Sequence, residues 1–136
     1  MSQDVYARVL DAYARQSWAI DHGDAQGWAD SFTPDGTFTS PSYPRDYCGT
    51  TELVGFAEDF ARSAKQDDVV RRHVVSNVLV DNRGDRGADA RCTLQIVEQP
   101  TGGPPRIVRV VDVHDEWVLA GPAKVRHRRV TQGENQ

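Results

Sequence analysis

Apolar residues in the first half of the chain recur at helical spacing. One stripe, over residues 4–22, consists of Val5, Val9, Tyr13 and Ile20. It predicts a first helix that Gly23 ends, and Asp24 can cap a short second helix. A third helix is predicted after Thr50 or Thr51, either of which can cap it. Its buried face consists of Leu53, Phe56, Phe60 and Ala64.

In the second half of the chain the apolar period changes to two. Strands are predicted over residues 69–81, 88–99, 106–119 and 123–130. A shorter strand, 37–40, follows the turn signal Pro34-Asp35-Gly36, and the two prolines and one glycine of residues 41–49 predict a loop. Three helices followed by antiparallel hairpins predict an α+β fold. The helices should pack on one face of a curved, mainly antiparallel sheet, with a ligand pocket between the layers.

Length and charge narrow the class of protein. The 136 residues suit one domain, predicted over residues 1–130, with a polar tail over 131–136. A net charge of −4 argues against partners such as nucleic acid or an anionic membrane. No apolar run is long enough to span a bilayer and the N-terminus has no signal-peptide pattern, so a cytoplasmic location is expected. Cys48 and Cys92 are too few for a metal site and are expected to be free thiols. No phosphate loop, metal set or flavin motif is present, so no cofactor is predicted.

Two residues could carry acid–base chemistry. Asp21 ends the first helix, and His73 lies near the start of the strand over residues 69–81. A histidine can both take and give a proton near neutral pH, and a carboxylate on its other ring nitrogen fixes the tautomer. Taken separately, an aspartate at a helix end is usually a capping group and a histidine in a strand is usually a satisfied core residue. The pair has chemical meaning only if the fold brings the two side chains together.

The order of elements and several local strings resemble the nuclear-transport-factor-2-like superfamily, in particular its SnoaL-like polyketide cyclase branch. The matching strings are Trp18-Ala-Ile-Asp-His-Gly-Asp24, Trp28-Ala-Asp-Ser-Phe-Thr-Pro-Asp-Gly-Thr-Phe38, Cys48-Gly-Thr50, Arg72-His73 with Ser76-Asn77, and His127-Arg-Arg-Val130. The resemblance implies a cone-shaped α+β barrel, with three N-terminal helices in the concave face of the sheet. It also implies a homodimer formed through the outer sheet face. The superfamily includes cyclases, dehydratases, isomerases, hydrolases and non-catalytic subunits, so the fold alone does not define the function.

Within the superfamily, the scytalone dehydratase and hexachlorocyclohexane dehydrochlorinase types are similar at Asp21 and His73. Those enzymes use the two residues as a dyad that removes a proton. The second histidine of the scytalone type would fall near Cys92 or Leu94 and is absent. The ketosteroid isomerase type needs an aspartate where this chain has Ser40. The Asp–Arg–Asp set of the limonene epoxide hydrolase type has no clear match.

Four further residues are candidates for substrate binding. Trp18 lies three residues before Asp21 and could stack on an aromatic substrate or pack in the core. Tyr43 lies in the loop over residues 41–49, where it could form a lid or simply lie on the surface. Asn77 shares the strand parity of His73 and could donate a hydrogen bond into the pocket. His127 lies in a family-like string and could be structural or line the pocket.

The resemblance implies a cofactor-independent acid–base enzyme of bacterial secondary metabolism. Its substrate would be a small hydrophobic, polyketide-like molecule, and its reaction a cyclisation, dehydration or isomerisation. His73 would act as general base and acid, and Asp21 would orient it. The alternatives are a non-catalytic ligand-binding protein, a partner subunit like the small subunit of ring-hydroxylating dioxygenases, and an epoxide hydrolase.

Overall fold

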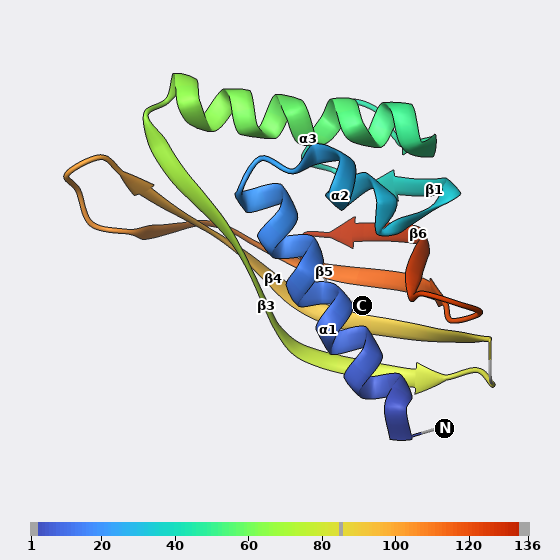
Figure 1. The fold of residues 1–136 in the computed structure, drawn as a ribbon. Helices are drawn as coiled ribbons and strands as arrows, with labels where there is room; N and C mark the ends of the chain where they lie inside the picture. The colour runs from blue at the N-terminus through green and yellow to red at the C-terminus, as the bar shows by residue number, and fades with distance from the viewer. Residues whose placement is uncertain (1–2, 85, 134–136) are drawn as a thin grey trace.

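Figure 1 shows the fold in a computed structural model, which describes residues 3–84 and 86–133. The helices of this part of the chain are α1 (Gln3–Asp21), α2 (Ala25–Asp30) and α3 (Gly49–Gln66). Its strands are β1 (Phe32–Thr39), β2 (Tyr47–Cys48), β3 (Val69–Asn82), β4 (Gly87–Pro100), β5 (Arg106–Val118) and β6 (Lys124–Thr131). The predicted elements are therefore present in the predicted order, and β2 is an additional short strand inside the expected loop.

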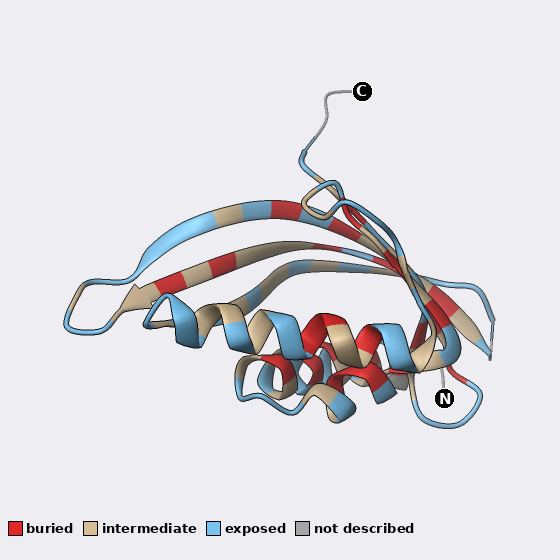
Figure 2. Ribbon diagram, turned by 90° about the horizontal axis from the view of Figure 1, so that it is seen from above, coloured by how far each residue is buried: buried red, intermediate tan, exposed pale blue. Residues whose placement is uncertain are grey.

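The strands form one curved, mixed sheet that is not closed. Their order is β2-β1-β6-β5-β4-β3, so β2 and β3 are its two edges. Strands β1 and β6 run parallel, and every other neighbouring pair is antiparallel. The three helices lie in the concave side of the sheet, where α1 packs on β3 and α3 packs on β1 (Figures 1 and 2). The predicted α+β fold, with helices in the hollow of a mainly antiparallel sheet, is confirmed.

The core fills the space between the helices and the sheet. Figure 2 shows that buried residues gather on the helix and strand faces that look into this space. The alternation predicted for β4 is present, since Ala88, Ala90, Cys92 and Ile96 are all buried. The largest fully buried side chains are Trp117, Phe32, Leu53, Val9 and Val125. Removing each large apolar side chain from water contributes about 1.5–3 kcal/mol, so this layer holds the helices on the sheet.

Strand β1 begins earlier than predicted. Its register moves from Phe32 opposite Val125 to Thr37 opposite His127, so β1 holds more residues than β6 between the two pairs. The extra residues, Pro34-Asp35-Gly36 among them, form an irregularity within the strand. The prediction of a turn that precedes the strand is therefore wrong, because these residues form an irregularity inside β1 and the chain continues in the same strand after it.

The helix starts follow the predictions in one case and depart from them in another. Asp24 caps α2, because its side chain accepts a backbone hydrogen bond from the first turn. Helix α3 is capped at Cys48, and the expected caps Thr50 and Thr51 lie inside the helix. The Cys48 side chain makes no capping hydrogen bond, and the Glu52 carboxylate accepts the backbone N–H of Cys48 at 2.9 Å, which ties the start of the helix to its first turn.

The last strand extends one residue beyond the predicted domain boundary. Thr131, expected to begin the polar tail, pairs with Asp112 as the final residue of β6. The rest of the expected tail includes residues 134–136, which lie outside the described residues. Within the described ranges, none of the helices combines the length and apolar character needed to cross a membrane.

Candidate active site

Asp21 and His73, which are far apart in sequence, meet at the end of α1. The Oδ1 atom of Asp21 lies 2.7 Å from Nδ1 of His73. Its Oδ2 atom accepts a hydrogen bond of 2.9 Å from the His73 backbone N–H. The two side chains are 9% and 16% exposed, respectively. A carboxylate that is hydrogen-bonded to both the ring and the main chain fixes the position and the rotation of the imidazole.

The position of His73 in the sheet explains why Asp21 binds there. Strand β3 is an edge, so alternate backbone N–H groups point away from β4 and have no neighbouring strand to accept them. The N–H of His73 is one of these groups, and the last residue of α1 satisfies it. The end of α1 therefore covers the free edge of β3, and the same residue, Asp21, also places its carboxylate against the His73 ring.

The imidazole faces the interior of the fold. Two small cavities, of about 20 and 50 Å³, are each lined by His73 together with Trp28, Leu94 and Arg128. An ionised carboxylate only accepts hydrogen bonds, so Nδ1 carries the hydrogen in the bond to Asp21. In the neutral ring this leaves Nε2 as the nitrogen with a lone pair, available to a molecule in the cavity. The described residues that line the two cavities include no other histidine and no aspartate or glutamate.

A buried ionic network forms the floor beside these cavities. Arg128 donates to both carboxylate oxygens of Asp115, at 2.9 and 2.8 Å, and to Gln16 at 2.7 Å. The Tyr13 hydroxyl donates to the same carboxylate at 2.7 Å, and Trp117 donates to the Tyr13 oxygen at 3.4 Å. Burial, followed by the charge of Asp115, raises the pKa of Tyr13, so this phenol stays protonated and keeps donating. The network satisfies Asp115 completely and gives the pocket floor a fixed shape.

The positions for which the resemblance implies additional catalytic groups in other enzyme types also lie at the cavities. Ser40 lines one cavity, Cys92 lines the other, and Leu94 lines both. Burial, followed by the charge of Asp115, raises the pKa of the Cys92 thiol to about 11, so it stays protonated at neutral pH. Neither Ser40 nor Cys92 therefore brings a second imidazole or a carboxylate to these cavities.

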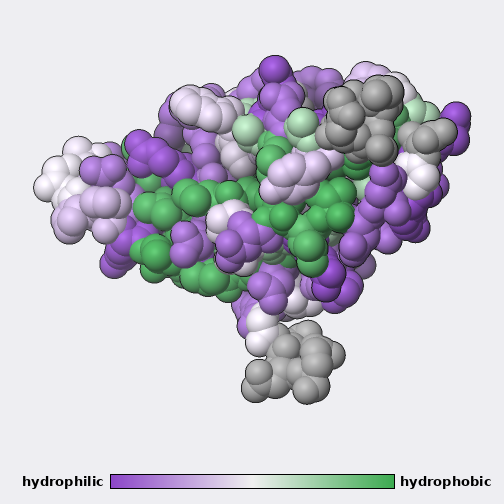
Figure 3. Space-filling model, turned by 90° about the horizontal axis from the view of Figure 1, so that it is seen from below, coloured by the Kyte–Doolittle hydropathy of each residue, from purple (hydrophilic) through white to green (hydrophobic). Residues whose placement is uncertain are grey.

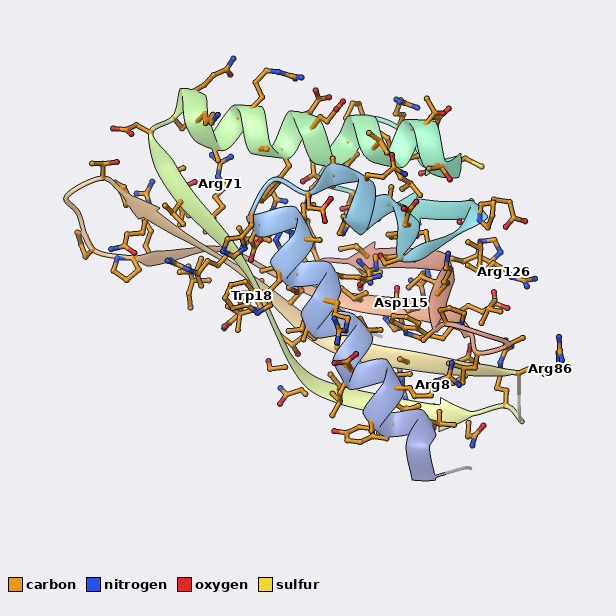
Figure 4. All side chains as sticks on the ribbon, in the orientation of Figure 1. Arg8, Trp18, Arg71, Arg86, Asp115 and Arg126 are labelled. Carbon is orange, nitrogen blue, oxygen red and sulfur yellow. The ribbon has the colours of Figure 1, made fainter. Side chains whose placement is uncertain are left out.

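Of the four substrate-binding candidates, the structure brings Tyr43 to the cavity that His73 lines. Trp18 is 67% exposed and stacks on His22, with ring centroids 4.6 Å apart. Figure 4 labels it on α1. Trp18 therefore lies outside both His73 cavities, and the residues of α1 that line the smaller one include Ser17 and Ile20. Successive helix positions are rotated by about 100°, so Trp18, next to Ser17, points away from that cavity.

Asn77 and His127 also lie away from the cavities. A β-bulge between Ser76 and Leu79 gives Asn77 a positive φ of 53° and leaves it exposed. The bulge reverses the strand parity, so the residue that packs on the core is Val78. His127 is exposed, and its Nδ1 lies 2.7 Å from the Thr37 hydroxyl. The structure therefore does not place either residue where it could touch a molecule beside His73.

One lining residue, Arg109, was not predicted. It lines the larger of the two His73 cavities together with Tyr43 and Phe56. The strand alternation contained the signal, since Val111, Val113 and Trp117 of the same parity are all buried. A charged residue on the core face of a strand is a candidate for a binding role because its burial is otherwise unfavourable.

The structure is an α+β fold with a histidine–carboxylate pair beside internal cavities, and comparison with known proteins gives the family. The sequence matches the SnoaL-like domain family over residues 3–129, so the chain belongs to this family. None of the curated protein sequences shows a significant match to it. The expected family is therefore confirmed from most of the chain.

Solved structures of similar fold agree with this assignment. ActVI-ORFA from Streptomyces coelicolor is 25% identical, with 98% of each chain covered and a TM-score of 0.86. A protein from Catenulispora acidiphila in complex with S-DNPA is 27% identical, with 94% of this chain and 92% of that chain covered and a TM-score of 0.80. An NTF2-like protein with a cystatin-like fold from Novosphingobium aromaticivorans is 16% identical. The superposition covers 98% of this chain and 85% of that chain, with a TM-score of 0.84. At this identity, the similarity shows only that the fold is shared.

Proposed function

We propose that this protein is a cofactor-independent acid–base enzyme that acts on a small polyketide-like molecule. The observation that carries the proposal is the double contact of the Asp21 carboxylate with the ring and the backbone of His73 beside an internal cavity. A side chain held in one orientation at a largely apolar site is what general acid–base catalysis requires. The family includes proteins of the polyketide cyclase and dehydratase type, and the pair fits that chemistry.

In the proposed reaction, Nε2 of His73 removes a hydrogen from a carbon next to a substrate carbonyl. The C–H bonding electrons form a carbon–carbon double bond, the carbonyl π electrons move onto the oxygen to give an enolate, and the ring becomes an imidazolium. Asp21 accepts the Nδ1–H throughout and stabilises the charged ring. The imidazolium then returns its proton, either to another carbon, which is an isomerisation, or to a departing hydroxyl group, which is a dehydration. If the enolate carbon instead attacks a second carbonyl of the same molecule, the π bond of that carbonyl breaks, the imidazolium protonates the resulting alkoxide, and the product is a ring.

The substrate class follows from the lining of the cavity. Trp28, Phe38, Tyr43 and Phe56 surround it, and such side chains favour flat, conjugated molecules. The similarity to ActVI-ORFA and to the protein in complex with S-DNPA supports a role in bacterial secondary metabolism. We include Tyr43 in substrate binding through its ring and its hydroxyl group.

The proposal is tested with 2-tetralone, a bicyclic ketone with activated hydrogens next to its carbonyl. The protein, purified alone in D₂O, should accelerate the exchange of these hydrogens, followed by proton NMR. A protein that only binds ligands, or that only accompanies a larger catalytic chain, would leave the exchange at the rate of buffer alone. That outcome would contradict the proposal.

We also propose that two copies of the chain associate through the outer face of the sheet. Figure 3 shows hydrophobic side chains gathered on the side of the molecule where β3 forms the sheet edge. Exposed apolar residues of β3 and β5 on the outer face include Val70, Val74, Ile107 and Val110. Val74 and Val110 both lie opposite Gln95, so they form one row across three strands. An apolar patch of this kind is typical of a protein interface.

A Val74→Lys and Val110→Glu double variant is expected to be monomeric, because it places charged groups in the centre of the interface. Sedimentation velocity measures the result, and the wild type should sediment as a dimer. The matched control is Tyr6→Lys, which changes an apolar residue of α1 that is 49% exposed and should leave the dimer intact. A wild-type protein that stays monomeric at micromolar concentration would overturn this part of the proposal.

A further inference from the structure

A wide cleft lies next to the larger of the two His73 cavities. It has a volume of about 510 Å³ and lies between α3 and the ends of β3, β4 and β5. Its aromatic lining consists of Tyr43, Tyr47, Phe56 and Phe60. The cleft and the inner cavity share Tyr43, Phe56, Ile96 and Arg109 as lining residues, so the two spaces adjoin at these four residues. We call the boundary that they form the passage.

Arg109 brings a positive charge into this passage. Its Nη1 donates to the Tyr43 hydroxyl at 3.2 Å, and its guanidinium lies 5.6 Å from the centroid of the same ring. No ion pair joins Arg109 to any carboxylate within residues 3–84 and 86–133. A guanidinium group has five N–H donors, so one that bonds to a single neutral partner keeps donors available for an anion.

The other arginines of the cleft and the cavity are engaged. Arg71 of β3 reaches towards α3 (Figure 4) and pairs with Glu98 at 2.9 Å and with Asp67 at 2.7 Å. Arg128 is held by Asp115. Arg109 therefore differs from both in having no carboxylate partner where the passage meets the His73 cavity.

We propose that Arg109 binds the carboxylate of an aromatic carboxylic acid and thereby sets the orientation of the substrate. This inference rests on the proposed function, because it takes the His73 cavity as the place of reaction. The planar guanidinium accepts a carboxylate in a bidentate arrangement, and the Tyr43 ring shields the pair from water. With the acid group at Arg109, the rings lie along Phe56 and Ile96, and the far end of the molecule points to His73. Arg109 is thus a specificity-determining residue that selects acids over neutral analogues of the same shape.

The test compares the binding of 2-naphthoate and 2-naphthamide, which have the same ring system and differ in charge. Isothermal titration calorimetry at neutral pH should show that the wild type binds naphthoate roughly tenfold to hundredfold more tightly. Arg109→Gln should bind the two probes equally, mainly through a loss of affinity for naphthoate. The matched control is Arg72→Gln, which makes the same charge change at an exposed position of β3 and should keep the full preference.

Equal affinity of the wild type for the two probes, including no measurable binding of either, would overturn the inference. So would a preference for naphthoate that persists in Arg109→Gln. A His73→Ala variant should keep the preference, since the naphthoate group contacts Arg109 and no proton is transferred. If the preference holds but 2-tetralone exchange is absent, the proposed reaction fails and the anion site stands. If exchange is present but the preference is absent, the anion site fails alone.

Discussion

Replacing His73 by alanine is expected to lower the rate of 2-tetralone exchange by about 10²–10⁴-fold. The reason is that no other histidine, aspartate or glutamate lines the two cavities within the described part of the chain, so no neighbour can replace the lost base. The exchange rate is measured by NMR at saturating ketone, and the fold is checked by circular dichroism. The matched control is His127→Ala, which removes an exposed histidine and should leave the rate unchanged.

Replacing Asp21 by asparagine should also slow the exchange, although the imidazole remains. The amide is neutral and can no longer stabilise the imidazolium, and its NH₂ group cannot accept from the ring or from the His73 backbone. Because the two residues act as a unit, the double variant should be no slower than His73→Ala. A folded His73→Ala protein with the wild-type rate would show that another group performs the proton transfer.

The largest expected effect on stability comes from the buried ion pair. The Asp115 side chain is 0% exposed and that of Arg128 is 11% exposed. Replacing Asp115 by alanine would leave Arg128 as a buried charge without its partner and would remove the acceptor of the Tyr13 hydroxyl. The free energy of unfolding should fall by about 3–5 kcal/mol, measured by urea denaturation.

Two further variants separate the loss of the charge partner from a general effect of mutation. Asp59→Ala breaks a surface pair with Arg62, whose side chains are 71% and 59% exposed, and should cost at most about 1 kcal/mol. The double variant Asp115→Leu with Arg128→Met removes both charges and should recover much of the lost stability. A loss below about 1 kcal/mol in Asp115→Ala would mean that water reaches Arg128 and that the pocket floor is not rigid.

The sequence contained enough information for the element order and for the face that each helix and most strands bury. These features depend on the hydrophobic period, which is a local property of the chain. The contact of Asp21 with His73 is not local, and the residues alone did not predict it. It was predicted through the resemblance to a family in which the two positions meet. In the structure, the separation of 2.7 Å between Asp21 Oδ1 and His73 Nδ1 shows that the fold brings them together.

The prediction for Asn77 is wrong because the regular alternation of strand β3 is interrupted there. Asn77 has the same parity as His73 only if β3 is regular, and the bulge before Leu79 turns it outward. Asparagine adopts a positive φ more readily than most residues, but this preference does not by itself indicate a bulge. For Arg109, by contrast, strand parity is a reliable guide, because it places the residue on the core face of β5. A charged side chain at such a position is a candidate for ligand binding.

The measurement that tests the dyad most directly is nitrogen-15 NMR of His73, which reports the protonation state of each ring nitrogen. If Asp21 holds the ring as proposed, Nδ1 of the neutral imidazole carries the hydrogen and Nε2 shows the chemical shift of a bare nitrogen. In Asp21→Asn this preference should weaken, and the signals should indicate a mixture of tautomers. A wild-type spectrum in which Nε2 carries the hydrogen would contradict the assignment of His73 as the base.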